Sequence, residues 1–350
     1  MKITYLCYWD LQRADGVADK ISAQISRWRA AGHDVDVYAL AADNGALEAP
    51  APGTQTFRFG GAADRLAATT RLATAVRRSH ADLVYLRYDV FLPTLAAAFG
   101  QSKLVVELNS NVGAELQARS QTVARYERLQ RRLLLRRADG AVAVTTELER
   151  ELRRDRPSLA TVTIANGIEL GAVRNSEQKG GAPRLVYIGE AVYWQGVDKI
   201  IQLAEARPSW SFDLVGVGDE LSVPPNVTCH GFLARDGYAQ LLARADVALG
   251  TLALHRKQMQ EASPLKVRRY LEFGLPLIVG YTDTDLVGLD PWWLLTLPNV
   301  ETNVRDSLAE IDAFVETVAG RRVPRDEVEP LISAAAKETR RLAFFESVAG

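Results

Sequence analysis

The sequence is poor in the residues that build cross-links and metal sites. Its 350 residues include two cysteines, Cys7 and Cys229, which are too few for a disulfide scaffold or a thiolate metal site. The four histidines form neither an HxxxH nor an HExxH pair. A zinc hydrolase of that type is therefore not expected.

The chain also lacks long apolar runs and an excess of charge of one sign. Nowhere do eighteen apolar residues run together, and the opening MKITYLCYWD has no signal-peptide pattern. Lys and Arg total 42 and Asp and Glu total 43, so no global basic field attracts nucleic acid. We expect a cytoplasmic protein whose electrostatic partners are met by local patches.

Several sequence signatures of phosphate binding and hydrolysis are missing as well. No GxGxxG follows a predicted strand, because Gly216-Val217-Gly218 lacks the third glycine, and this disfavours a dehydrogenase. There is no GxxxxGK[ST] loop, which excludes a P-loop kinase, and no GxSxG elbow of the α/β-hydrolases.

What the sequence does contain is a regular alternation of short β-branched runs and longer amphipathic stretches. Several runs are apolar on both faces, as in strands that helices cover on each side of a parallel sheet. The predicted strands are Ile3–Cys7, Val35–Leu40, Leu83–Leu86, Leu104–Glu107, Ala141–Val144, Thr161–Ile164, Leu185–Ile188, Phe212–Val215, Val227–Cys229, Val247–Leu249 and Leu277–Val279.

A polar stretch without periodicity, residues 171–183, divides this alternation into two series. Two successive βαβα series predict an α/β protein with two doubly wound, Rossmann-like domains, residues 1–170 and 184–330, joined by that linker. Because ligands in such sheets bind at the carboxyl ends of the strands, an interdomain cleft is the expected site.

The most informative segment is EASPLKVRRYLEFGLPLIVG, residues 261–280. It predicts a loop, a helix, a Gly-Leu-Pro turn and a buried strand, with Ser263 capping the helix and Pro264 at its first position. Free N–H groups at such a helix start favour an anion such as a diphosphate. Lys266 in the first turn opposes the helix dipole unless a phosphate binds there; a solvated lysine on a capped helix is the alternative.

This segment resembles the donor-binding motif of family 4 retaining glycosyltransferases with the GT-B fold, in the form S-P-L-K that ends at Lys266. Other segments match in order and spacing. They are GVADKISAQISRWRAAGHDV (16–35), VVELNSN (105–111), RRADGAVAVTTELERELRR (136–154), ANGIEL (165–170), YIGEAVYWQGVDKIIQLAE (187–205) and ADVALGTLALHRKQM (245–259).

The resemblance implies a GT-B fold, two Rossmann-like domains with an interdomain cleft, and a C-terminal helix, residues 331–350, that crosses back to the first domain. It implies transfer of a sugar from a nucleoside diphosphate sugar to a hydroxyl acceptor with retention. No metal and no cofactor beyond that donor are expected. The implied acceptor is a glycan, a lipid-linked molecule or a small molecule.

Individual positions follow from the same resemblance. Glu261 matches the first Glu of the family's Glu-x7-Glu motif and is expected to contact the donor sugar. Glu107 and Asn109, which end a strand, are assigned to the catalytic site. The expected donor-binding residues are Gly16, Arg256, Ser263, Pro264, Leu265, Lys266, Arg269, Glu272 and Phe232.

The sequence departs from the family pattern at several of these positions. The second Glu of the motif falls on Arg269, which cannot accept ribose hydroxyls, so Glu272 one turn on is the expected substitute. The usual basic pair falls on Glu190 and Gln195, and Arg256 and Lys266 are its nearest replacements. The family's first-domain His falls on Asn109, which cannot act as a general base.

One predicted helix is unusually basic, and this makes an anionic membrane a candidate partner besides the sugar nucleotide and the acceptor. Seven arginines load it, and an apolar stripe of Val123, Tyr126, Leu129 and Leu133 runs along it. The stripe either faces the protein's own core or lies on an anionic membrane, which would make the protein membrane-peripheral. The arginines of this helix, residues 119–137, are Arg119, Arg125, Arg128, Arg131, Arg132, Arg136 and Arg137.

The sequence therefore predicts a metal-independent, retaining glycosyltransferase. Two alternatives remain: a sugar-nucleotide epimerase of the same architecture, and a GT-B protein that has lost activity and serves as a binding partner. The base, the sugar, the acceptor and the oligomeric state do not follow from the sequence.

Overall fold

The computed structural model describes residues 1–12, 15–43, 53–90, 95, 98–117, 120–173 and 181–350. The chain forms two compact units. Unit 1 contains Met1–Ala165 and Ala334–Gly350, and unit 2 contains Asn166–Ser333. The chain thus enters unit 2 ahead of the stretch 171–183 and returns to unit 1 at Ala334.

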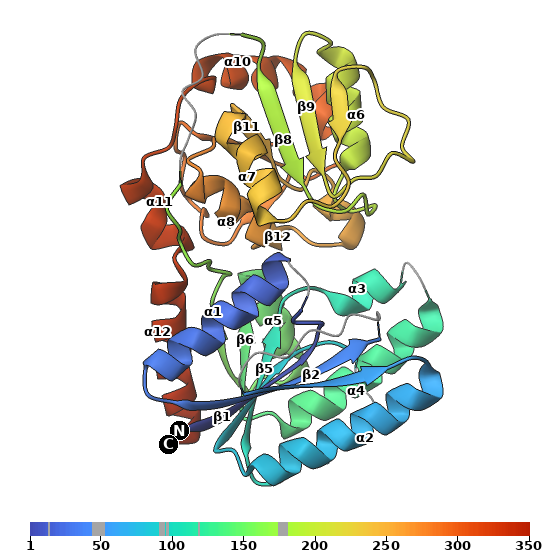
Figure 1. The fold of residues 1–350 in the computed structure, drawn as a ribbon, viewed down its shortest axis with the longest axis vertical. Coiled ribbons are helices and arrows are strands. Elements are labelled where there is room, and N and C mark those ends of the chain that lie inside the picture. Colours follow the sequence, from blue (N-terminus) through green and yellow to red (C-terminus); the bar gives the residue numbers. More distant parts are fainter. Residues whose placement is uncertain (13–14, 44–52, 91–94, 96–97, 118–119, 174–180) are drawn as a thin grey trace. The chain divides into compact units, whose positions relative to one another are not determined.

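Unit 1 is built on a seven-stranded parallel sheet with the strand order β3-β2-β1-β4-β5-β6-β7 (Figure 1). Every strand predicted from the first half of the sequence is present, and β3 is an additional edge strand. The elements are β1 (Lys2–Tyr8), α1 (Gly16–Ala30), β2 (Asp34–Ala42), β3 (Thr54–Phe59), α2 (Ala62–Ser79), β4 (Leu83–Arg87), β5 (Lys103–Leu108), α3 (Val112–Gln117), α4 (Gln121–Arg137), β6 (Gly140–Ala143), α5 (Thr146–Asp155), β7 (Ala160–Thr163) and α12 (Ala334–Ala349).

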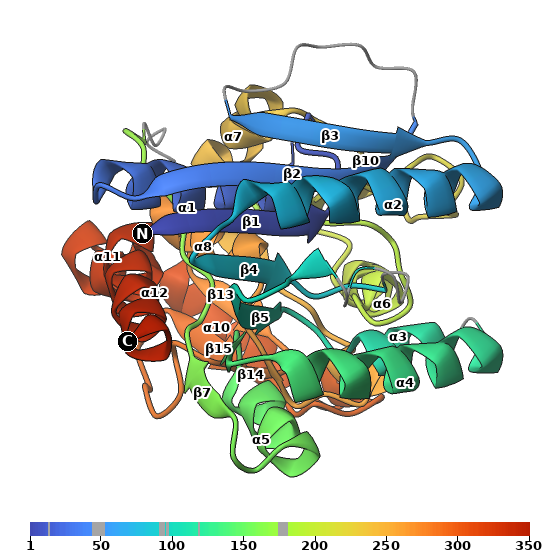
Figure 2. The ribbon, with the colours of Figure 1, turned by 90° about the horizontal axis from the view of Figure 1, so that it is seen from below.

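Different helices cover the two faces of this sheet (Figure 2). Tyr5, Val37 and Tyr85 share one face and pack in one core with Trp28 of α1 and Phe345 of α12. Because side chains alternate along a strand, Tyr38 lies on the opposite face, where α2 packs.

The helix α12 belongs to unit 1 although unit 2 precedes it in the chain. Its Phe345 ring lies 5.1 Å from the Trp28 ring, nearly perpendicular to it. The Arg341 guanidinium donates to the Tyr85 hydroxyl at 2.8 Å, and Arg340 donates to the Thr163 carbonyl at 3.2 Å. The segment Arg340–Val348 therefore packs on residues that precede Gly171.

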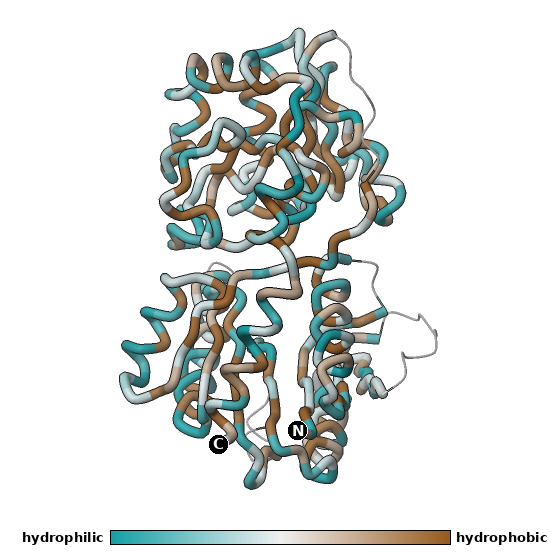
Figure 3. Tube along the Cα trace, turned by 90° about the vertical axis from the view of Figure 1, so that its left-hand side faces the viewer, coloured by the Kyte–Doolittle hydropathy of each residue, from teal (hydrophilic) through white to brown (hydrophobic). Residues whose placement is uncertain are grey.

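Unit 2 has a six-stranded parallel sheet of order β10-β9-β8-β11-β13-β15 and a short two-stranded ladder of β12 with β14. The inner strands of both sheets are buried and apolar, and Figure 3 shows the hydropathy along the chain of each unit. The elements are β8 (Arg184–Ile188), α6 (Val197–Ala206), β9 (Ser211–Val215), β10 (Val227–Cys229), α7 (Arg235–Arg244), β11 (Val247–Leu249), the 3-10 helix η2 (Leu254–Lys257), β12 (Glu261–Ala262), α8 (Leu265–Glu272), β13 (Leu277–Val279), β14 (Thr282–Asp283), β15 (Leu294–Thr296), α9 (Asn303–Asp306), α10 (Leu308–Val318) and α11 (Arg325–Ile332).

Candidate functional site

The first turn of α8 holds a cation without an acidic partner. The Lys266 ammonium donates to the Gln195 side-chain carbonyl at 2.7 Å and lies 4.1 Å from the centre of the Tyr187 ring. In the part of the chain that the structure describes, no carboxylate comes within ion-pair distance of it. Burial lowers the pKa of Lys266 to about 7, so a bound anion would supply the charge that this ammonium lacks.

Backbone groups at the same place are suited to an anion. The N–H groups of Leu265 and Lys266 find no hydrogen-bond acceptor among the described residues, as expected at the start of a helix. Gly189, directly after β8, has a φ of +150°, and a Cβ there would lie 2.8 Å from the Lys266 ammonium. Only glycine leaves this approach to Lys266 open.

Ser263 does not cap α8, contrary to the sequence prediction. Pro264 is the residue that precedes the helix, and no side chain caps it. The Ser263 hydroxyl instead accepts the Asn166 N–H at 2.8 Å, and the Asn166 side-chain amide donates to the Ser263 carbonyl at 2.5 Å. The Ser263 hydroxyl is thus used by the Asn-Gly-Ile turn that begins at Asn166. It is not available to cap the N–H groups at the start of α8.

Arg268, which the sequence analysis missed, anchors the same turn. Its side chain is 1% exposed; the Nε atom donates to the Asn166 carbonyl at 3.1 Å, and Nη1 and Nη2 pair with Asp283. Nη2 also donates to Asp285 at 2.6 Å. A buried arginine needs such partners, and the local sequence gave no sign that Arg268 is buried.

Arg269 pairs with Glu272, one helical turn further along α8. The Arg269 Nη1 atom donates to one Glu272 oxygen, and the other accepts the Gly171 N–H at 2.7 Å. Arg235 lies 3.6 Å from the same carboxylate, whose side chain is 1% exposed. Glu272 is therefore occupied by protein partners in this structure, and it would reach a ribose only if this cluster rearranged.

Arg256, expected to bind the diphosphate, is paired with two carboxylates in this structure. Its Nη1 and Nη2 atoms bind both oxygens of Asp198 at 2.9 and 2.7 Å. Its remaining N–H groups bind Glu301 and the Tyr193 carbonyl. Since the guanidinium has five N–H groups and all are used, the network fixes the loop that holds Tyr193 but leaves no donor for a phosphate.

The remaining residues of unit 2 that were predicted to bind the donor lie in different segments of the fold. Glu261 is buried at the β12–β14 ladder. Phe232 is 70% exposed after Gly231 and packs on no core, so its ring is free to stack on a planar ligand. Gln195, where a basic residue was expected, holds Lys266 in place and also accepts from Thr251 at 2.9 Å.

In unit 1 the end of β5 carries a buried charge cluster centred on Glu107. Its carboxylate lies 3.0 Å from the Lys20 ammonium, 3.3 Å from Arg341 and 3.4 Å from Arg87. Burial would raise the pKa of Glu107, but Lys20, Arg341 and Arg87 outweigh it and hold that pKa well below its usual range. Glu107 is therefore held in its charged form by three cations, which makes it a poor general base.

Asn109 is fixed by the same cluster. Its amide donates to Glu107 at 2.9 Å, and its carbonyl accepts from Lys20 at 2.9 Å. Burial lowers the pKa of Lys20 to about 8. The sequence analysis missed Lys20, which is buried in α1 next to the apolar residue Ile21. The strand–helix turn places Gly16 at the start of α1, where the Asp15 carboxylate caps Val17 and Ala18.

The basic helix α4 does not bury its apolar stripe in the core of unit 1. Its buried residues include Glu127 and Gln130, which bind Tyr88 and the Asp89 carbonyl at 2.6 and 3.0 Å. The apolar stripe faces outward instead, with Val123 39%, Leu129 58% and Leu133 43% exposed. Arg119, the first arginine of the predicted helix, lies outside the described residues. The arginines exposed along α4 are Arg125, Arg128, Arg132 and Arg136.

Two kinds of feature are absent from the described residues. No three His, Cys, Asp or Glu side chains gather there as a metal-binding group. None of the helices in these ranges combines the length and the hydrophobicity needed to cross a membrane.

Comparison with known proteins finds solved structures with the same fold. The chain aligns over 99% of its length with sucrose-phosphate synthase from Thermosynechococcus elongatus, at 15% identity, a TM-score of 0.75 and 99% coverage of that protein. It aligns likewise with Anabaena HepE in complex with UDP-glucose, at 14% identity, a TM-score of 0.66 and coverage of 99% and 100%.

A third similar structure is the catalytic domain of starch synthase IV from Arabidopsis thaliana bound to ADP and acarbose, at 11% identity, a TM-score of 0.65 and 99% coverage of both chains. No curated protein sequence matches the chain. Residues 15–171 match the model named Glycosyltransferase Family 4. Over that region the protein thus resembles Glycosyltransferase Family 4, and its two parallel sheets have the GT-B fold of glycosyltransferases.

Proposed function

We propose that the protein is a retaining glycosyltransferase that moves a sugar from a nucleoside diphosphate sugar to a hydroxyl acceptor without a metal ion. The observation that carries the proposal is the start of α8. There Lys266 has no acidic partner in the described chain, and two backbone N–H groups are unused beside it. A diphosphate carries the charge and the acceptor oxygens that this arrangement lacks.

Unit 2 holds the donor in this proposal. Lys266 and the Leu265 N–H bind the diphosphate, Gly189 leaves room for it, and the exposed Phe232 ring stacks on the base. Glu261 contacts the donor sugar, as the family resemblance implies. Similar structures contain UDP-glucose or ADP, which supports a nucleotide-sugar donor here as well.

The acceptor side is assigned to unit 1, and its chemistry favours retention without a protein base. Glu107 is held ionised by three cations, and Asn109 has no basic atom. The departing diphosphate then takes the proton of the acceptor hydroxyl as the new glycosidic bond forms on the same face. Lys266 and the α8 N–H groups stabilise the charge on that diphosphate as the sugar–oxygen bond breaks.

The protein works at an anionic membrane surface, and α4 is the contact. A helix that exposes Val123, Leu129 and Leu133 beside a row of arginines has the pattern of an interfacial helix. Each arginine near an anionic bilayer contributes about 1 kcal/mol, so four make attachment strong at low salt and weak at high salt. A lipid-linked acceptor would fit this location.

The donor is tested with a panel of UDP-, GDP- and ADP-sugars. The protein should be stabilised against heat by one nucleotide and should hydrolyse the matching sugar nucleotide slowly, faster with acceptor extract. NMR of the first product should show the anomeric configuration of the donor. Epimerised donor in place of free or transferred sugar would favour the epimerase, and no stabilisation by any nucleotide would favour the partner protein that has lost activity.

The membrane contact is tested by flotation with vesicles of phosphatidylcholine alone or with 30 mol% phosphatidylglycerol. Binding should need the anionic lipid, and it should fall when Leu129 and Leu133 are replaced by Ser. The matched control replaces Arg150 and Arg154, exposed on α5, with Gln. Binding that the α4 variant retains, or that the α5 variant loses equally, would contradict a specific role for α4.

A further inference from the structure

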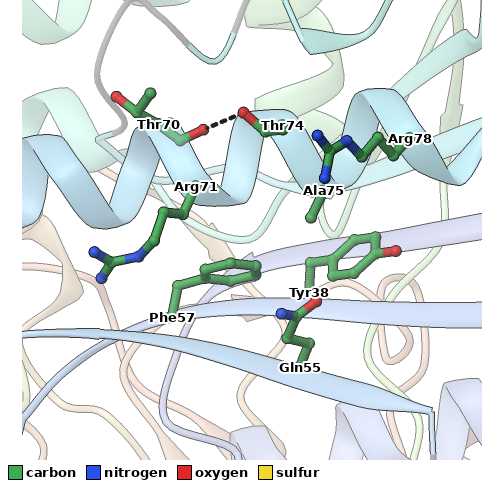
Figure 4. A pocket seen from close by; sticks show the side chains of 8 residues that line it. All are labelled: Tyr38, Gln55, Phe57, Thr70, Arg71, Thr74, Ala75 and Arg78. Carbon is green, nitrogen blue, oxygen red and sulfur yellow. Dashed lines mark hydrogen bonds between the residues drawn. The ribbon is translucent and has the colours of Figure 1, made fainter.

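A cavity lies in unit 1, between the C-terminal half of α2 and strands β2 and β3. Its volume is about 520 Å³. Ala75 lies at its centre and faces the rings of Tyr38 and Phe57, so the hollow exists because a small residue stands where a larger one would fill it (Figure 4). The lining residues are Tyr38, Gln55, Phe57, Thr70, Arg71, Thr74, Ala75 and Arg78.

The cavity is distinct from the Glu107 cluster. Tyr38 and Phe57 point to the face of the sheet that α2 covers, whereas Glu107 shares the face of α1 and α12. Strand β3 also lies four strand positions from β5, about 19 Å at 4.8 Å per strand. A ligand in this cavity would not touch Glu107 or Asn109.

The cavity combines two unused cations with aromatic and polar groups. Within the described ranges, neither Arg71 nor Arg78 has an ion pair, a hydrogen bond or a ring contact. Both project from α2 at the cavity, seven residues apart, or about 10.5 Å along the helix. Arg78 also suits the helix C-terminus, but the dipole gives no reason for Arg71, in the middle of α2.

Between the two arginines lie groups suited to a sugar. The rings of Tyr38 and Phe57 offer an apolar floor, 6.4 Å apart between centres. The Gln55 amide makes no hydrogen bond to any described residue, and the Thr70 and Thr74 hydroxyls donate to the helix but can still accept. Rings contact the C–H face of a sugar, amides and hydroxyls bind its hydroxyls, and guanidinium groups bind a carboxylate in two-point contact.

We propose that this cavity binds an anionic saccharide, with a sugar unit on the Tyr38 and Phe57 rings and acidic groups at Arg71 and Arg78. The site is separate from donor binding and does not depend on the proposed transfer reaction. It would hold an acidic glycan at a distance from the reacting hydroxyl.

The test is calorimetric titration of the full chain with tetragalacturonate, in the absence of any sugar nucleotide. Maltotetraose is the uncharged counterpart, and inorganic polyphosphate is a polyanion without sugar rings. Tetragalacturonate should bind at least tenfold more tightly than either. Binding should weaken about tenfold or more in Arg71→Gln, and likewise in Ala75→Phe, which fills the cavity and keeps both charges.

Arg77→Gln is the matched control, because Arg77 is exposed on the same helix outside the cavity lining. It should bind tetragalacturonate like the parent. The proposal would be overturned if polyphosphate bound as tightly as tetragalacturonate and Ala75→Phe left that binding unchanged. Such a result would mean that surface charge alone attracts the ligand. Equal losses in Arg77→Gln and Arg71→Gln, or no binding of tetragalacturonate, would also overturn it. Thermal unfolding of each variant separates a lost site from a misfolded one.

Discussion

Lys266 makes the affinity for a diphosphate depend on pH in a way that isolates this one side chain. Its pKa in the free protein is about 7, lowered by burial, and a bound diphosphate must raise it. The ammonium is thus mostly present at pH 6 and mostly absent at pH 8. If only the charged form binds, affinity falls roughly tenfold between these values and keeps falling above them.

The measurement is calorimetric titration with the sugar nucleotide that stabilises the protein most, from pH 6 to 9. Its diphosphate has no group that titrates in this range, so the slope belongs to the protein. Proton uptake near pH 8, read from the dependence of the heat on buffer ionisation, should approach one per site. Binding without pH dependence would refute the reasoning.

Two variants sharpen the test. Lys266→Arg keeps a charge that does not titrate, so it should bind with a flat pH profile. Lys266→Met removes the charge, and the loss of a contact worth about 1.5–3 kcal/mol should weaken diphosphate binding by one to two decades. Nucleoside binding should hardly change in Lys266→Met; an equal loss for both ligands would point to disturbed folding.

Three further outcomes are expected. Arg269→Glu should lower the melting temperature and weaken donor binding, because it sets a second carboxylate against buried Glu272; a variant that binds donor more tightly than the parent would overturn our view of this site. Glu107→Gln should destabilise the protein at pH 7, and because the folded pKa of Glu107 is lowered, the difference from the parent should shrink as pH falls below about 4; a difference that does not change with pH would contradict this. Transfer activity should persist in EDTA; complete loss that magnesium or manganese restores would refute metal-free transfer.

The inner strands of both sheets were predictable because they are short, apolar runs that are buried on both faces. Val247–Leu249 and Leu277–Val279, for example, are strands β11 and β13 with the predicted bounds. Strand β3 was missed because Thr54–Phe59 alternates polar and apolar residues at a sheet edge, where one strand face meets solvent.

The candidate site was less predictable, because side-chain partners depend on segments far apart in the sequence. Ser263 has the residue type and position of a helix cap, but Asn166 lies 97 positions away and takes its hydroxyl. Arg256 has the charge to bind a diphosphate, but its guanidinium is paired with Asp198 and Glu301, which lie far from it in the sequence. Lys266 could be singled out from the sequence, since its conflict with the helix dipole is visible locally.

Amphipathic periodicity alone could not orient α4, for a related reason. The stripe of Val123, Leu129 and Leu133 allowed a core or a membrane contact, and the structure buries Glu127 and Gln130 beside apolar residues of the other face. Both buried side chains bind groups just after β4, namely Tyr88 and the Asp89 carbonyl. Periodicity reports that a helix has two faces, and only the partners of its polar residues decide which face is buried.

The return of α12 to unit 1 has a consequence for how the protein is made. During synthesis, residues 1–165 leave the ribosome before unit 2, but Arg341 and Glu338, which bind Tyr85 and Trp28, come after it. Until then the side of α1 that α12 covers is open, and the rings of Trp28 and Tyr85 lack their contact with Phe345. Unit 1 therefore completes its core after translation of unit 2, and a chain that stops short of α12 exposes an aromatic surface that a chaperone or protease can recognise.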